Sequence, residues 1–229
     1  MRLDSHVCFS PHHPPEHLEP ILRRNRFDGA ILAIDSPALP ATGPHIAAIL
    51  VRPSGLVQSD PRVRGVHAPI AEVTLDLAHS LSRRFLPLDL EMSPADFPEL
   101  LDLTARAPDL RIVIDHLARP QYSRSVMEDW LRGMQSAARL PNVFCKISGL
   151  LTEAQLPWTS APIRPFVQHA LAIFGPSRLM FGSEWPVRLP DITWKESLAA
   201  FTQSIGAQSI GVREQLLGGT AAAFYRIPA

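Results

Sequence analysis

Short apolar runs alternate along this chain with longer segments in which apolar residues recur every three or four positions. The short runs are continuous or nearly so, as expected for parallel strands that are buried on both faces. We expect eight such strands. They cover Leu3–Phe9, Gly29–Ile34, His45–Val51, Arg62–Ala68, Phe85–Met92, Arg111–His116, Asn142–Ser148 and Arg178–Ser183.

The longer segments have the period of amphipathic helices. Ser93 followed by Pro94 is typical of a helix start, and Thr193-Trp-Lys-Glu196 has the pattern of a capping box. The expected helices are Pro14–Arg24, Ala71–Arg83, Ser93–Ala107, Ser125–Ala138, Ala161–Phe174, Thr193–Ile205 and Arg213–Phe224.

Two architectures share this alternation, a (β/α)8 barrel and a doubly wound open sheet. The count of strands favours the barrel, and 229 residues are enough for a short one. The chain has no Gly-rich phosphate loop, which removes the commonest functions of the open sheet. We therefore predict an α/β protein with a single (β/α)8 TIM-barrel domain over residues 1–229.

Two of the expected crossovers are short and rich in proline, Asp35–Pro44 and Arg52–Pro61. Proline prevents a regular helix, so we expect a barrel that is shortened around its second and third crossovers. The outer faces of Gly29–Ile34 and Ile46–Val51 would then be exposed. We expect a second subunit to bury them, most simply in a two-fold homodimer. The alternative is cover by the N-terminal helix or the C-terminal segment.

Charge and composition narrow the range of partners. Lys+Arg and Asp+Glu are both 22, and the pI is about 7.1, so the sequence argues against nucleic acid or an anionic membrane surface as a partner. No apolar run reaches the roughly 18 residues of a membrane span, and the N-terminus is unlike a secretory signal. Cys8 and Cys145 are expected to be reduced thiols of a cytoplasmic protein. A small molecule is the expected partner.

Four of the expected strands carry ionisable side chains at or near their ends. His6 and Cys8 are two apart on the first strand and therefore face the same side. His116 ends the sixth strand, Lys146 lies in the seventh, and Glu184 follows the eighth. The C-terminal ends of barrel strands form the active-site face, so we expect these five side chains to converge there.

Each of these residues also has a structural interpretation. Cys8 can be a buried apolar residue instead of a zinc ligand. Asp115 and His116 can be a hydrogen-bonded structural pair, and Glu184 can be a capping or salt-bridging residue at a turn. Lys146 is either paired with a carboxylate or placed to polarise a substrate oxygen.

The remaining histidines carry a weaker signal. His67 closes the fourth strand, where a structural histidine is the commoner case. His12, His13 and His17 lie in a proline-rich segment after the first strand. We expect them to be solvated, with at most one substrate contact among them.

Taken together, the chain resembles the amidohydrolase superfamily, specifically the TIM-barrel branch that includes sugar lactonases and the 2-pyrone-4,6-dicarboxylate lactonase. The resemblance spans nearly the whole chain and is weak between residues 27 and 60. The segments that carry it are Leu3-Asp-Ser-His6, Arg62–Val66, Ile112–Pro120, Pro141–Gly149, Phe174–Val187 and Gly219–Tyr225.

The resemblance assigns roles residue by residue. His6 matches the first histidine of the family's His-x-His, His116 matches its barrel histidine, and Lys146 matches the lysine of its Asn-Val-x-x-Lys-x-Ser-Gly segment. Glu184 stands where the family has the aspartate that activates water. Three positions depart from the pattern: Cys8 replaces the second histidine, Glu184 is one methylene longer than aspartate, and His67 replaces a frequent arginine.

The resemblance implies a hydrolase that opens a small lactone, with Glu184, His116 and Lys146 as catalytic residues. His67 and Trp185 are expected to contact the substrate. Decarboxylation and amide hydrolysis are alternatives within the superfamily. A barrel that has lost catalysis and only binds a ligand is an alternative of a different class.

A metal ion is the cofactor that the resemblance suggests, either zinc or manganese. The expected ligands are His6, Cys8, His116 and Glu184. Some relatives work without a tightly bound metal, so a metal-free site is the alternative.

Overall fold

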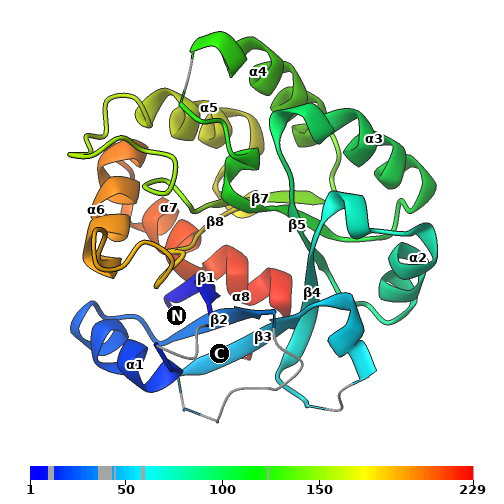
Figure 1. Cartoon of the computed structure of the whole chain (residues 1–229), viewed down its shortest axis with the longest axis horizontal. Coiled ribbons are helices and arrows are strands. Elements are labelled where there is room, and N and C mark those ends of the chain that lie inside the picture. Colours follow the sequence, from blue (N-terminus) through cyan, green and yellow to red (C-terminus); the bar gives the residue numbers. More distant parts are fainter. Residues whose placement is uncertain (10–12, 36–42, 44, 58–59, 123, 229) are drawn as a thin grey trace.

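The computed structural model describes residues 1–9, 13–35, 43, 45–57, 60–122 and 124–228. Eight parallel strands, paired in chain order, curl into a nearly closed barrel with helices around it (Figure 1), which confirms the predicted (β/α)8 fold. The strands are β1 (Leu3–Cys8), β2 (Gly29–Ile34), β3 (Ile46–Val51), β4 (Val63–Pro69), β5 (Leu88–Glu91), β6 (Ile112–Ile114), β7 (Val143–Ile147) and β8 (Leu179–Phe181).

Backbone hydrogen bonds just beyond β8 join the last strand to the first. The amide of Glu184 donates to the carbonyl oxygen of His6 at 2.8 Å, and the amide of Cys8 donates to the carbonyl oxygen of Trp185 at 2.9 Å. The residues that follow β8 are thereby held against the C-terminal half of β1. This arrangement places Glu184 next to His6, which lies far away in the sequence.

The helices follow the predicted segments. Thr193 and Glu196 form the expected capping box at the start of α6. The α-helices are α1 (Pro15–Arg24), α2 (Leu75–Arg83), α3 (Phe97–Arg106), α4 (Arg124–Ala138), α5 (Arg164–Phe174), α6 (Trp194–Ile205), α7 (Ile210–Glu214) and α8 (Thr220–Tyr225). Short 3-10 helices are η1 (Pro53–Val57), η2 (Ile70–Glu72), η3 (Pro94–Asp96), η4 (Asp115–Ala118) and η5 (Pro176–Arg178). Within the described residues, none of the helices has the length and apolar character needed to cross a membrane.

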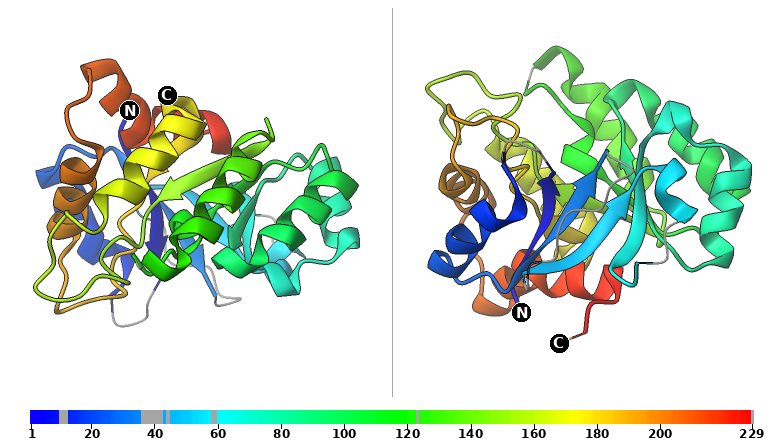
Figure 2. Two further views of the ribbon diagram at one scale, coloured as in Figure 1. Left: turned by 90° about the horizontal axis from the view of Figure 1, so that it is seen from above. Right: turned by 60° about the horizontal axis from the view of Figure 1, so that its bottom comes forward.

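The last predicted helix, Arg213–Phe224, is wrong as a single element. A π-helical segment, Gln215–Gly219, separates α7 from α8. The break falls at Gly218, whose backbone is not helical and where a Cβ would lie only 2.5 Å from the amide nitrogen of Leu3. The chain thus passes close to the start of β1. Helix α8 packs against the first residues of the strands, at the end of the barrel opposite to their C-terminal ends (Figure 2).

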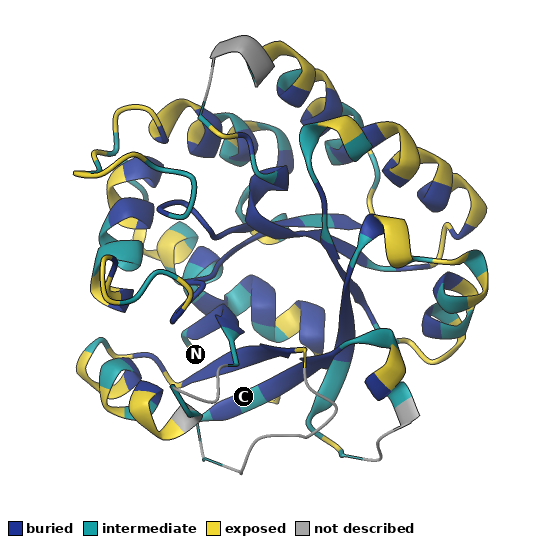
Figure 3. Ribbon diagram, viewed as in Figure 1, coloured by how far each residue is buried: buried dark blue, intermediate teal, exposed yellow. Residues whose placement is uncertain are grey.

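The crossovers around β3 correct one expectation. Most of Asp35–Pro44 lies outside the described residues. The next crossover holds the 3-10 helix η1, as a reduced covering element. Even so, all of β2 and most of β3 are buried in the single chain (Figure 3). Leu18 and Leu22 of α1 share one buried cluster with the outer side chains of these strands. The expected exposed apolar face is therefore wrong, and the homodimer, which rested on it, stays an untested prediction.

Candidate active site

The loop after β8 is held in place by a residue of β1. Asp4 accepts hydrogen bonds from the amide of Ser183 at 2.8 Å and from the indole of Trp194 at 2.6 Å. Gly182 allows the close approach, since a Cβ there would lie 2.6 Å from the Cβ of His6. These contacts explain why His6 and the residues after β8 come together at the C-terminal end of the barrel.

His116 lies just beyond β6 and faces His6. The two rings are 4.6 Å apart in an edge-to-face arrangement. The hydroxyl oxygen of Ser148, on the segment after β7, lies 2.9 Å from Nδ1 of His116. The backbone of His116 has φ 53°, and the next three residues are also in the left-handed region. Such strain in non-glycine residues persists only where packing enforces it, and it is concentrated at functional sites.

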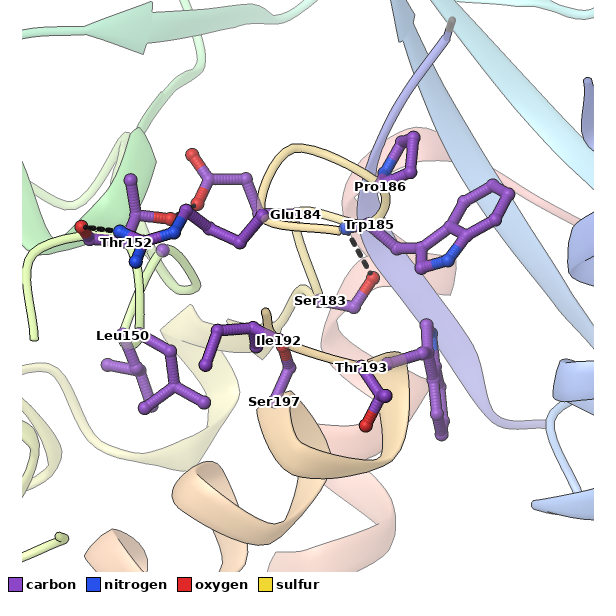
Figure 4. Close-up of a pocket in the computed structure, with 13 residues that line it drawn as sticks. Leu150, Thr152, Ser183, Glu184, Trp185, Pro186, Ile192, Thr193 and Ser197 are labelled. Atoms are coloured by element: carbon purple, nitrogen blue, oxygen red, sulfur yellow. Dashed lines mark hydrogen bonds between the residues drawn. The ribbon is translucent and has the colours of Figure 1, made fainter. Parts of the chain in front are cut away.

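Glu184 reaches the same place from the other side. Its Oε1 lies 3.5 Å from Nε2 of His116 and 3.7 Å from Nη2 of Arg119. The hydroxyl of Thr152 donates a hydrogen bond to its Oε2. Glu184 is also in the left-handed region, with φ 59°. Figure 4 shows its side chain pointing toward Thr152, whereas that of Trp185 points to the opposite side of the loop.

Lys146 is fully buried beneath the two histidines. Its Nζ contacts Oδ2 of Asp89, and it lies 3.0 Å from Oδ1 of Asp115 and 3.0 Å from Nδ1 of His6. The hydroxyl of Tyr225, from α8, donates to Oδ2 of Asp89 at 2.6 Å. Of the two interpretations of Lys146, pairing with carboxylates is the one observed.

These contacts set the charge of the buried groups. Burial acts to lower the pKa of Lys146, but Asp115 and Asp89 outweigh it and raise that pKa. Burial would raise the pKa of Asp115, yet the charges of Lys146 and His6 hold it well below its usual range. Burial and Lys146 both act to lower the pKa of His6, but Asp115 overcomes them and raises it to about 10.

Burial also shifts the pKa values of His116 and Glu184, whose side chains face each other. Burial, followed by the neighbouring charge of His6, lowers the pKa of His116 well below its usual range, so this imidazole is neutral. Burial raises the pKa of Glu184, and the hydrogen bond from Thr152 offsets part of that effect. A carboxylate with a raised pKa beside a neutral imidazole has the properties of a general base.

A group of donor atoms suited to a metal lies at the centre of the site. The donor atoms of His6, Asp115 and His116 all lie within 4.8 Å of one another. Both carboxylate oxygens of Asp115 lack a hydrogen-bond partner among the described residues, although one is paired with Lys146. Imidazole nitrogens with a carboxylate oxygen are suitable ligands for zinc, so these residues fit a divalent cation.

This group differs in part from the predicted ligands. It contains His6 and His116, but its third member is Asp115. Glu184 is not a member of this group, but its Oε1 lies 3.5 Å from Nε2 of His116. Cys8 is a free, half-buried thiol outside the group. Ligation by Glu184 or Cys8 therefore stays a prediction.

The two predicted substrate-binding residues flank this centre. Nε2 of His67 lies 2.9 Å from the carbonyl oxygen of Ile34, and its Nδ1 lies 3.6 Å from Glu91. Trp185 is buried, and its ring packs edge-on against His13, with centroids 5.8 Å apart. Substrate contact by His67 or Trp185 stays a prediction. His17 is exposed on α1, and His12 lies outside the described residues.

Several site residues were not predicted. Asp89 stands between two leucines of β5, so the rule that drew attention to Lys146, a charge inside an apolar strand, would also have found it. Thr152 and Arg119 lie outside the strands and reach Glu184 only in the folded chain. No hydrophobic periodicity marks them, although Arg119 lies in one of the segments that carry the family resemblance.

The fold and this centre define a (β/α)8 barrel with an acid, imidazole and candidate metal site at its C-terminal face. The family model described as amidohydrolase matches residues 5–227. The chain therefore belongs to the amidohydrolase family.

Two relatives show the degree of similarity. The L-fucono-1,5-lactonase of Burkholderia ambifaria is 35% identical over 192 residues, which are 73% of this chain and 63% of the relative. An uncharacterised protein of Sinorhizobium fredii is 37% identical over 147 residues, 64% of this chain and 49% of the relative. The chain thus spans about half to less than two thirds of the length of these relatives.

Solved structures confirm the fold. An amidohydrolase from Burkholderia multivorans with bound zinc superposes with a TM-score of 0.85 at 23% identity, and both chains are fully covered. A putative 2-pyrone-4,6-dicarboxylic acid hydrolase from Pseudomonas putida superposes with a TM-score of 0.75 at 21% identity, covering 100% of this chain and 98% of that one.

Proposed function

We propose that this protein is a hydrolase that opens a small lactone. The observation that carries the proposal is the placement of Glu184, a buried carboxylate 3.5 Å from His116 at the C-terminal end of the barrel. The similarity to an L-fucono-1,5-lactonase supports a cyclic ester as the substrate.

The first step is attack by water. Ionised Glu184 takes a proton from a water molecule while the water oxygen bonds to the ring carbonyl carbon. Thr152 and Arg119 contact the two carboxylate oxygens and hold the base in one orientation. This positioning matters because glutamate has one more rotatable bond than aspartate, so more freedom must be restrained.

The second step opens the ring. The tetrahedral centre collapses, the bond from the carbonyl carbon to the ring oxygen breaks, and Glu184 returns its proton to that oxygen. The product is a hydroxy acid. The guanidinium of Arg119, which lies beside Glu184, favours the negative charge that develops on the carbonyl oxygen. Lys146 is fully buried, so it acts by holding His6 and Asp115, as a positioning residue.

The cofactor of this proposal is one divalent cation, zinc or manganese. His6, Asp115 and His116 would hold it. A cation bound there would act as a Lewis acid toward the substrate carbonyl.

The test is a panel of sugar-acid lactones, including L-fucono-1,5-lactone, with acid release followed by a pH indicator in weakly buffered solution. Glu184→Gln protein is the matched control for spontaneous opening. The proposal predicts acid release that depends on Glu184 for at least one lactone. Binding of a lactone without turnover would favour the ligand-binding alternative, and release of carbon dioxide from a carboxylated substrate would favour a decarboxylase.

A further inference from the structure

Lys146 lies against two of the three residues that would hold a metal ion. Its Nζ is 3.0 Å from Oδ1 of Asp115 and 3.0 Å from Nδ1 of His6. The ammonium group is fully buried, so water does not screen it. Its positive charge therefore lies next to the donor atoms that a cation at this centre would contact.

A metal ion and this ammonium group compete in two ways. They repel each other, and at a few ångströms in a buried site that repulsion is strong. They also share a partner, because Asp115 cannot give its full negative charge to a metal while Lys146 is paired with it. The strength of the second effect depends on how firmly Lys146 is held by its other partner, Asp89.

Asp89 holds Lys146 from outside the metal group. Its Oδ2 contacts Nζ and also accepts the hydrogen bond from Tyr225. Asp89 is fully buried and is not one of the candidate ligands. The ammonium group is therefore shared between one carboxylate of the metal group and one carboxylate outside it.

We propose that Lys146, shared between Asp89 and Asp115, sets the affinity of this centre for a divalent cation and keeps it low. The inference rests on the metal centre of the proposed function. A purely structural role for Lys146 and Asp89 would not predict the following result. Weakening the hold of Asp89 on Lys146 and removing both residues must change metal affinity in opposite directions.

Asp89→Asn removes the negative charge of Asp89 and keeps its shape. Lys146 is then left with Asp115 as its carboxylate partner, and Asp115 becomes less available to a metal. Zinc affinity should fall by at least ~3-fold. The double variant Lys146→Met with Asp89→Asn removes the ion pair without changing the net charge. It frees Asp115 and removes the repulsion, so zinc affinity should rise by at least ~10-fold over wild type.

The experiment measures the Kd of Zn²⁺ for metal-stripped wild type, Asp89→Asn and the double variant, by competition with a chromophoric zinc chelator. Thermal melts of the metal-free proteins check folding. Opposite shifts support the inference. Parallel weakening of both variants, or no change in either, overturns it.

A milder substitution keeps the inference testable if the double variant does not fold. Tyr225→Phe removes one hydrogen bond from Asp89, which then holds Lys146 more firmly, so zinc affinity should rise by roughly 2-fold. An unchanged or lower zinc affinity would contradict the inference. If none of these proteins binds zinc, the metal centre and this inference are both wrong. Lactone hydrolysis in chelator-treated buffer then tests the proposed function separately.

Discussion

Nε2 of His116 lies 3.5 Å from Oε1 of Glu184. The two residues come from segments after β6 and β8, and both have a left-handed backbone. Two strained positions that meet side chain to side chain in a buried place are best explained by a function that requires this exact contact. Burial lowers the pKa of the His116 imidazole and raises the pKa of the Glu184 carboxyl, so the two pKa values are shifted toward each other.

Thr152→Val should move the pH dependence of turnover. Glu184 acts as a base in its ionised form, so activity rises as pH increases through its pKa. Burial raises that pKa, and the hydroxyl of Thr152 opposes the rise by favouring the ionised form. Removing the hydroxyl should therefore shift the acidic limb of kcat to higher pH. The measurement is kcat against pH for both proteins under identical metal conditions. A shift to lower pH would contradict the role of Thr152.

Gly182→Ala should disturb the site at its closest approach. The new methyl group would lie 2.6 Å from the Cβ of His6, so either β1 or the loop after β8 must move. We expect a loss of about 1–3 kcal/mol of unfolding free energy, together with reduced activity. Gly211→Ala is the control, since among the described residues a Cβ there would meet no side chain or backbone atom within 4 Å, apart from those of its chain neighbours and its own helix. Urea unfolding of both variants checks the prediction, and equal stabilities would count against the close packing.

The two cysteines should differ in reactivity. Cys145 is fully buried, and burial raises the pKa of its thiol, whereas Cys8 is half-buried. A thiol reagent should therefore modify one thiol in the native protein and both in denaturant. The same assay with Zn²⁺ tests the predicted ligation by Cys8. Zinc should slow the reaction of Cys8 if this thiol is a ligand, and an unchanged rate would remove Cys8 from the metal site.

Ionisable residues inside a strand or directly after one carried a signal in the sequence, and residues farther out in the loops did not. His6 and Lys146 stand out because a strand buried on both faces tolerates an ionisable group only when it is paired or functional. Asp89 had the same signal. Thr152 and Arg119 are defined only by where their loops fold. The break at Gly218 lies where the chain comes close to Leu3, which is far away in the sequence, and no local pattern contains that approach.

The exposed face expected on β2 and β3 shows a related limit. Apolar periodicity indicates that a strand needs cover, and proline indicates that a regular helix will not supply it. Neither signal indicates which other residues cover the strand. Here all of β2 and most of β3 are buried within the single chain, and Leu18 and Leu22 of α1 belong to the same buried cluster as the outer side chains of these strands. The absence of a regular covering helix therefore does not by itself require a second subunit.

The most direct test of the proposed function is the kcat of Glu184→Gln on a lactone that the wild-type protein opens. Glutamine keeps the size of the side chain and can still accept the hydrogen bond from Thr152, but it cannot remove a proton. We predict that kcat falls by at least ~10²-fold while the melting temperature stays close to that of wild type. Glu184→Asp, which keeps the carboxylate and shortens its reach, should lose less. A folded Glu184→Gln protein that hydrolyses the lactone at the wild-type rate would contradict the proposed mechanism.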